Sequence, residues 1–175
     1  MKAVLITDQH FGARNNSLQI LEHQKKFYEE TFFPFLDETG ITTVITLGDF
    51  FDHRKYTNNY IIYQSKKIFF DELKRRNIQT YMIVGNHDCS FKNSLFPNTP
   101  DILLAEYDNV TVISNPQTVD INGFEIAMIP WICQENYDDS YSVIKNSTAD
   151  ILFGHLEIDG FLMYRGAESH GGLSP

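Results

Sequence analysis

The feature that most constrains the fold is a pattern that recurs along the chain: a short apolar segment ends, and a residue able to bind a metal ion follows. The clearest case is the stretch Thr42 to Asp52, where the run Thr-Thr-Val-Ile leads into Gly48 and Asp49. Apolar β-branched runs are typical of buried strands, and glycine allows a sharp turn. Because open α/β sheets bind ligands at the carboxyl ends of their strands, Asp49 is a candidate site residue. Taken alone, it is equally well explained as a helix cap.

The amino-terminal segment repeats this pattern. Lys2 to Thr7 is predicted to form a buried first strand, and Asp8-Gln9-His10 follows it directly. Alternate side chains of an extended backbone point to the same side. We therefore expect Asp8 and His10 to bind the same ion, although a single Asp-x-His is a weak signal.

Two later segments end in the same way. The predicted strands are Ile78 to Val84 and Ala149 to Phe153, and both are expected to be buried. The residues that follow are Asn86, His87 and Asp88 in the first case and His155 in the second. Packing explains such a set of strand ends poorly, although a polar glycine turn remains the alternative for each one.

Helices are predicted between these strands. Ser17 to Leu36 and Asn58 or Asn59 to Arg76 carry apolar residues at helical spacing, with charged residues on the other face. We expect Pro34 to kink or end the first helix. Strand–helix–strand units favour a parallel sheet. The remaining predicted elements are short helices over Asp101 to Tyr107 and Tyr137 to Asn146, and antiparallel strands over Val110 to Ser114, Gln117 to Ile121 and Phe124 to Ile129.

Length and composition limit the class of protein. The 175 residues suffice for one domain with a sizeable core. No apolar run reaches membrane-spanning length, and Asp8 comes too early for a signal peptide. Cys89 and Cys133 predict a reduced, cytosolic protein, with a bond between the two as the alternative. The net charge of −9 argues against a simple basic nucleic-acid binder, but bound metal ions would neutralise part of it.

The candidate ligands at the strand ends form a mixed oxygen and nitrogen set. Its members are Asp8, His10, Asp49, Asn86 and His155. The set lacks thiolates, so it does not suit structural zinc; it favours manganese or iron, with zinc as an alternative. One carboxylate shared by two groups of ligands indicates a two-metal site of the kind that acts on phosphate esters.

Other residues of these loops are candidates for catalysis and substrate binding. His87 is expected to protonate the leaving oxygen or to stabilise developing charge, with Asp88 holding its tautomer. The residues expected to contact substrate are Asp52, His53 and Arg54. Trp131, the only tryptophan, is expected to pack near the site.

The motifs together carry a resemblance. They are Asp8-x-His10, Gly48-Asp49-x-x-Asp52, Gly85-Asn86-His87-Asp88 and Gly154-His155. They resemble those of the calcineurin-like metallophosphoesterases and, within them, the SbcD-type DNA repair nucleases (the meiotic-recombination nuclease family), including the recombination endonuclease subunits of T-even phages. The resemblance implies a four-layered α/β/β/α sandwich. It also implies that Asp8 and His10 bind one metal ion and Asn86 and His155 the other, with Asp49 bridging both and His87 as the catalytic histidine.

The resemblance implies cofactors and partners as well. Two divalent ions are expected, manganese foremost, with magnesium, iron or zinc as alternatives. The expected partners are DNA, an SbcC-like ATPase subunit and, in the complete protein, a second copy of the chain in a homodimer. No membrane partner is expected.

The chain departs from the family pattern after His155. The family's Gly-His-x-His motif finds no match there, and His170 is followed by two glycines. We therefore interpret residues 1–175 as an incomplete metallophosphoesterase domain, truncated at the carboxyl end. The last two histidine ligands and the DNA-capping and ATPase-binding regions would be absent, and the fragment weak or inactive. A phosphatase of the same fold and a non-catalytic docking module are the alternative functions.

Overall fold

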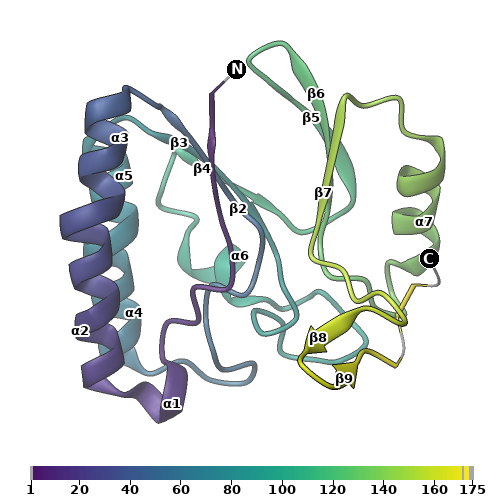
Figure 1. Ribbon diagram of the computed structural model, residues 1–175, viewed down its shortest axis with the longest axis horizontal. Helices are drawn as coiled ribbons and strands as arrows, with labels where there is room; N and C mark the ends of the chain where they lie inside the picture. The colour runs from purple at the N-terminus through teal and green to yellow at the C-terminus, as the bar shows by residue number, and fades with distance from the viewer. Residues whose placement is uncertain (1, 171, 174–175) are drawn as a thin grey trace.

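The computed structural model describes residues 2–170 and 172–173 of the chain. Its layers follow one another in the order helices, sheet, sheet, helix (Figure 1). This arrangement confirms the α/β/β/α sandwich expected from the sequence. Within the described residues, no helix combines the length and the apolar character needed to cross a membrane.

The first sheet contains four parallel strands in the order β1-β2-β3-β4. Their bounds are Val4–Ile6, Thr43–Thr46, Gln79–Ile83 and Val110–Ile113. Because the strands share one direction, their carboxyl ends lie at one edge of the sheet, at the bottom of Figure 1. The loops that carry the candidate ligands after β1, β2 and β3 therefore meet at that edge.

Two strand predictions need correction. β1 was expected to be buried, but it is an edge strand and Leu5 is 48% exposed. β4 was expected in an antiparallel hairpin, but it pairs in parallel with β3. The chain reaches β4 through α6 (Thr99–Leu103), which begins earlier than the predicted helix because Asn98 caps it.

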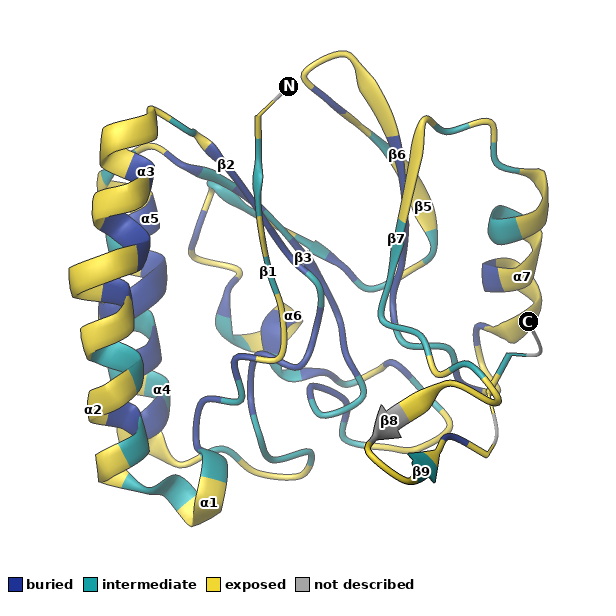
Figure 2. Cartoon of the chain, viewed as in Figure 1, coloured by how far each residue is buried: buried dark blue, intermediate teal, exposed yellow. Residues whose placement is uncertain are grey.

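Two long helical segments cover the outer face of this sheet and turn their buried sides toward it (Figures 1 and 2). The first joins α2 (Leu18–Phe27), the π-helical turn η1 (Tyr28–Phe32) and α3 (Phe33–Thr39), and follows the short α1 (Ala13–Asn16). The second joins α4 (Asn59–Ser65), the π-helical turn η2 (Lys66–Phe70) and α5 (Asp71–Arg75). Both predicted helices are confirmed.

The ends of these segments follow from their sequences. Pro34 does not end the first segment: it lies in the first turn of α3, directly after the π-helical turn η1, where the regular α-helix is interrupted. It ends at Gly40, whose φ of 65° is a common way to end a helix. Asn58 caps α4, as predicted, by accepting a hydrogen bond from the N–H group of Tyr60 at 2.8 Å.

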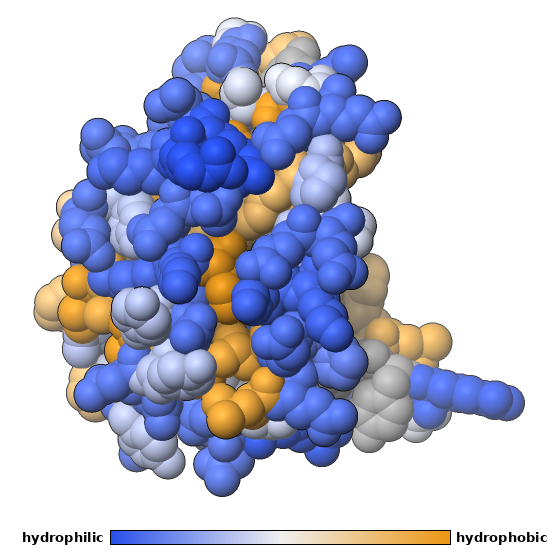
Figure 3. Space-filling model, turned by 90° about the vertical axis from the view of Figure 1, so that its left-hand side faces the viewer, coloured by the Kyte–Doolittle hydropathy of each residue, from blue (hydrophilic) through white to orange (hydrophobic). Residues whose placement is uncertain are grey.

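Figure 3 shows the outer face of the helical segments, where apolar side chains lie between hydrophilic flanks. One residue links the two segments. Arg76 lies over the ring of Phe33, with its guanidinium carbon 4.5 Å from the ring centre. Its Nε and Nη2 atoms donate to the two carboxylate oxygens of Asp37 at 2.8 and 3.1 Å. Arg76 therefore ties the end of α5 to α3.

The core has a separate part on each face of the first sheet. On the helical face it is rich in aromatic side chains, among them Phe32, Phe33, Phe50, Phe69 and Phe70. Between the two sheets it contains Ile45, Ile83, Ile113, Ile121, Ile126 and Met128. Val44 and Ile45, neighbours in β2, belong to different parts because successive side chains of a strand point to opposite faces. β2 is thus buried on both sides, which holds Asp49 in a fixed position.

The second sheet consists of β5 (Gln117–Ile121), β6 (Phe124–Ile129) and β7 (Ile151–Gly154). The β5–β6 hairpin is antiparallel, as predicted, and β7 pairs in parallel with β6 after α7 (Tyr137–Asn146). β7 was expected to be buried, but as an edge strand it leaves Ile151 and Leu152 more than a third exposed. A small pair, β8 (Leu162–Tyr164) and β9 (Ala167–Glu168), follows.

Candidate metal centre

The loops after β1 and β2 are joined by main-chain hydrogen bonds. The N–H groups of Asp8 and His10 donate to the carbonyl oxygens of Gly48 and Asp49 at 3.1 and 3.0 Å. Asp8, His10 and Asp49 all have positive φ angles, of 51°, 46° and 53°. The extended backbone expected for Asp8 and His10 is therefore wrong: a left-handed loop, held to its neighbour, brings their side chains together.

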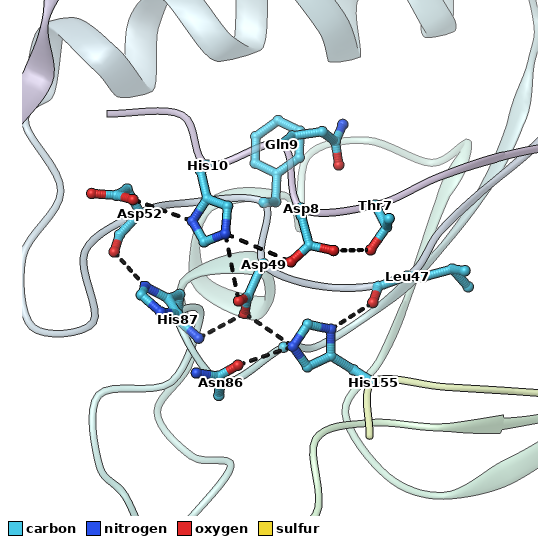
Figure 4. A network of polar contacts seen from close by, with 12 residues as sticks. Thr7, Asp8, Gln9, His10, Leu47, Asp49, Asp52, Asn86, His87 and His155 are labelled. Carbon is cyan, nitrogen blue, oxygen red and sulfur yellow. Dashed lines mark hydrogen bonds and ion pairs between the residues drawn. The ribbon is translucent and has the colours of Figure 1, made fainter. Parts of the chain in front are cut away.

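His10 faces two carboxylates through one ring atom. Its Nε2 lies 3.7 Å from Asp8 Oδ1 and 3.7 Å from Asp49 Oδ2, and its Nδ1 lies 3.2 Å from Asp52 Oδ1 (Figure 4). A metal-binding histidine commonly has a carboxylate or a carbonyl behind its second nitrogen, which fixes the ring. The carboxylate of Asp52 lies on that side of the His10 ring, at ion-pair distance but without a hydrogen bond.

His155 approaches Asp49 from the other side. Its Nδ1 lies 2.7 Å from the carbonyl oxygen of Leu47, which can only accept, so Nδ1 carries the proton in the neutral ring. The lone pair of Nε2 is then directed at Asn86 Oδ1, at 2.9 Å, and at Asp49 Oδ1, at 3.5 Å. Each carboxylate oxygen of Asp49 therefore faces a different histidine.

The spacing of these atoms fits metal ligands. Two atoms bound to one ion at about 2.0–2.2 Å lie about 2.8–3.8 Å apart for bond angles of about 90–120°, and the distances given above for Nε2 of His10 and of His155, 2.9 to 3.7 Å, fall in this range. The two ends of the Asn86 side-chain amide lie 3.2 Å from Asp49 Oδ2 and 3.1 Å from Arg54 Nη2. With its nitrogen toward Asp49 and His155 and its oxygen toward Arg54, the amide makes hydrogen bonds at both ends. A metal ion held by Asp49, His155 and Asn86 would instead require Oδ1 on the Asp49 side.

The charges of the site reinforce one another. Burial would raise the pKa of Asp49, but contacts with His155 and the N–H group of His87, 2.8 Å away, outweigh it, so this pKa lies below its usual value. Burial would lower the pKa of His155, but Asp49 and the Leu47 carbonyl outweigh it in turn and raise this pKa. Asp49 is therefore ionised at neutral pH, as a metal ligand must be.

His87 lies beside His10 and is oriented by Asp52. The two rings meet edge to face, with centres 4.9 Å apart. One ligand atom each of His10, Asp49 and His87 lies within 4.8 Å of the others. His87 Nδ1 lies 2.7 Å from the carbonyl oxygen of Asp52, so its Nε2 is the atom left for chemistry.

Asp88 has a different place from the one expected. It was expected to hold the tautomer of His87, but the Asp52 carbonyl does so. The fully buried Asp88 carboxylate instead accepts from the backbone N–H groups of Gly85 at 2.9 Å, Phe51 at 3.1 Å and Phe50 at 3.4 Å. Burial, opposed by these bonds, raises the pKa of Asp88 to about 6. Asp88 joins the loop after β3 to the loop after β2.

Two glycines allow the loops to approach so closely. A Cβ atom on Gly85 would lie 2.3 Å from both the backbone nitrogen and Oδ1 of Asp49. A Cβ atom on Gly48, whose φ is 98°, would lie 2.5 Å from the ring of His155. The sharp turn predicted at Gly48 is confirmed, and both positions also require a residue without a side chain.

The remaining candidates line the edge of the site. Arg54 lies over the ring of Trp131, with 5.0 Å between the guanidinium carbon and the ring centre, and both line a pocket of about 360 Å³ that reaches Asn86 and His155. This confirms that Trp131 packs near the site. His53 is turned toward Tyr56, on which it stacks at 5.7 Å. Asp52, expected to contact substrate, lies behind His10 and His87.

Sequence reasoning missed the groups that orient the ligands. The Thr7 hydroxyl donates to Asp8, and the carbonyls of Leu47 and Asp52 hold His155 and His87. Backbone carbonyls have no signature in a sequence. Thr7 gave no signal beyond its place beside Asp8.

A four-layer sandwich with histidine, aspartate and asparagine side chains gathered at its strand ends is the arrangement of a candidate metal-binding site on an α/β framework. A family model described as calcineurin-like phosphoesterase matches residues 1–173, and the chain belongs to this family. It is 37% identical over 171 residues to exonuclease subunit 1 of Enterobacteria phage T4, covering 98% of this chain and 50% of that protein. The family relationship expected from the motifs is thereby confirmed.

Other proteins are similar to this chain at lower sequence identity. A putative phosphoesterase, 244L, of Invertebrate iridescent virus 6 is 23% identical over 167 residues, covering 93% of this chain and 56% of that protein. The chain thus spans about half the length of these two relatives. Among solved structures, a protein of unknown function from Aquifex aeolicus is 18% identical, with a TM-score of 0.46 and coverage of 93% and 79%. The nuclease MPE of Pseudomonas putida is 20% identical, with a TM-score of 0.44 and coverage of 92% and 64%.

Proposed function

We propose that this chain is the catalytic core of a DNA nuclease that hydrolyses phosphodiesters with two divalent metal ions, manganese foremost. The observation that carries the proposal is the position of Asp49. Its Oδ2 faces His10 at 3.7 Å and its Oδ1 faces His155 at 3.5 Å, so one carboxylate can serve two ions. The identity to a protein named as an exonuclease subunit supports a nuclease over a phosphatase.

Each ion would have its own ligands. Asp8 and His10 would hold one, Asn86 and His155 the other, and Asp49 both. When bound, the ions would neutralise the phosphate charge and activate water for in-line attack. Residues 1–175 would form an incomplete domain whose further ligands, DNA-capping region and ATPase-binding region come from other parts of the complete protein, which would act on DNA as a homodimer with an SbcC-like ATPase subunit.

His87 would act on the substrate rather than on the metal. Its Nδ1 is engaged by the Asp52 carbonyl, and its backbone N–H donates to Asp49 Oδ1, which fixes the ring beside His10. In this position, Nε2 of the protonated ring can donate its proton to the leaving oxygen or stabilise the charge of that oxygen. Positioned acid catalysis typically contributes about 10²–10⁴-fold.

The test is single-turnover cleavage of end-labelled DNA with manganese by the complete protein, using wild type, His87→Ala and Asp49→Ala. We expect His87→Ala to lower the rate by about 10²–10⁴-fold with manganese affinity within a few-fold of wild type, and Asp49→Ala to abolish hydrolysis. Faster hydrolysis of p-nitrophenyl phosphate than of DNA would contradict the nuclease proposal. Loss of manganese affinity in His87→Ala would make His87 a ligand.

A further inference from the structure

We propose that Arg54, Asn86 and Trp131 form a nucleotide subsite beside the metal centre. In this subsite, Arg54 and the amide nitrogen of Asn86 bind a phosphate oxygen, and the pocket lined by Trp131 takes the attached nucleoside. The inference rests on the proposed nuclease function and names the part of the substrate that this side of the site recognises. It concerns the approximately 360 Å³ pocket that Arg54 and Trp131 share with Asn86 and His155.

The first observation is a pair of donors that face each other. When Asn86 Oδ1 is directed at Asp49 and His155, its Nδ2 lies 3.1 Å from Arg54 Nη2. Both groups only donate, so neither satisfies the other. Arg54 Nη1 is also buried without a hydrogen-bond partner. These N–H groups lack an acceptor, and a phosphate oxygen would supply one, with a charge opposite to that of the guanidinium.

The orientation of Asn86 links this subsite to the metal. With the amide reversed, its nitrogen would donate to Asp49 and its oxygen would accept from Arg54, so the phosphate donors would be used within the protein. An ion that binds Asn86 Oδ1 keeps the nitrogen turned toward Arg54. The anion-binding pair is therefore complete only when Asn86 has the orientation that suits the metal.

The second observation is the shape and chemistry of the pocket. The backbone N–H group of Trp131 donates a hydrogen bond to the Val84 carbonyl at 2.8 Å, which fixes the main chain at this residue. The Arg54 guanidinium lies over the Trp131 ring. Phe161 and Leu162 also line the pocket and are 60% and 69% exposed. Aromatic rings and guanidinium planes are the groups on which unpaired bases stack.

The two ends of the pocket also differ in charge. Glu157 lies among its lining residues, and its Oε1 accepts a hydrogen bond from Ser169 at 3.3 Å. This carboxylate repels a phosphate, whereas the Arg54 end attracts one. The phosphate is therefore expected beside Asn86 and the metal centre, with the nucleoside toward Trp131 and Phe161. A base seated there is unpaired, so the substrate would be a single strand or a frayed end of DNA.

The experiment is calorimetric titration of the complete protein with thymidine 5′-monophosphate and with inorganic phosphate, each with and without manganese. Arg54→Gln, Trp131→Leu and the control Arg75→Gln, which alters an exposed arginine on α5, are compared with wild type. We expect Arg54→Gln to weaken both ligands by about 10- to 100-fold in manganese, the usual effect of a charge-assisted hydrogen bond. Trp131→Leu should weaken the nucleotide by about tenfold and leave inorganic phosphate unchanged, within the range for base stacking. The control should match wild type.

Manganese binding without nucleotide separates this inference from the nuclease proposal. Arg54→Gln should bind manganese as wild type does or slightly more tightly, because Arg54 favours the reversed amide. If manganese binds all variants equally and Arg54→Gln keeps full nucleotide affinity, the subsite is refuted while the metal centre stands. If wild type binds no manganese, the proposed function itself fails.

Discussion

Replacing Asp88 by alanine tests whether this residue serves stability or chemistry. The substitution removes the acceptor of buried N–H groups on Gly85 and Phe51, at 2.9 and 3.1 Å, and of the longer contact from Phe50. A buried donor left without a partner costs about 1–3 kcal/mol. With two short bonds lost, we expect the free energy of unfolding to fall by about 3 kcal/mol, a large part of the roughly 5–15 kcal/mol typical of a domain.

The assay is urea unfolding followed by the fluorescence of Trp131, with the exposed Asp108→Ala as control. The pKa of Asp88, about 6, exceeds that of an unfolded aspartate. The contribution of Asp88 to the free energy of unfolding is therefore complete below about pH 4, and it declines as the pH rises through about 6. The deficit of Asp88→Ala should thus be larger at pH 5 than at pH 7.5. A stable variant that loses DNA hydrolysis by 10²-fold or more would show instead that Asp88 acts on the chemistry.

Other predictions follow from single contacts. Gly85→Ala should lower stability by about 1–3 kcal/mol and weaken manganese binding, because the new Cβ atom would lie 2.3 Å from Asp49; unchanged calorimetric titration would contradict this. Arg76→Met should lower the thermal midpoint at pH 7, and the deficit should shrink as the pH falls. Arg76 lowers the pKa of Asp37, so this stabilisation is present above the ordinary carboxyl pKa and is lost as the pH falls through the lowered value; a deficit that does not change with pH would refute it. Asp52→Ala should reduce manganese affinity, and turnover with it, because the Asp52 carboxylate lies 3.2 Å from His10 Nδ1; an effect on DNA affinity alone would support Asp52 as a substrate contact.

The central features of the fold were predictable because strand ends in a parallel sheet meet at one edge. The βαβ pattern up to Val84 predicts that Asp8, Asp49 and Asn86 lie together, and the parallel pairing of β1, β2 and β3 agrees with it. The edge positions of β1 and β7 were not predictable, since apolar residues look alike in central and edge strands. The parallel pairing of β4 was missed because hairpin signals between neighbouring segments outweighed the helical connection through α6.

Some features of the candidate metal centre were likewise predictable from the sequence, and others were not. Ligand types and their order could be read from the sequence, but the direction of each side chain could not. The alternation of side chains along a strand predicted an extended backbone at Asp8 and His10, but both residues have positive φ angles. Asp88 stands next to His87 in the sequence, yet its carboxylate turns to the backbone, where Gly85 and Phe51 offer N–H donors. Adjacency along the chain indicated a pair that three-dimensional packing did not form.

The most direct test of the central claim is a manganese titration of wild type and Asp49→Asn followed by electron paramagnetic resonance. The claim is that Asp49 bridges two ions, one beside His10 and one beside His155. It predicts that wild type at saturating manganese gives the signal of a spin-coupled ion pair, and that Asp49→Asn gives at most that of isolated ions. A wild-type spectrum of isolated ions alone, unchanged by the substitution, would contradict the bridging role and the two-metal mechanism that depends on it.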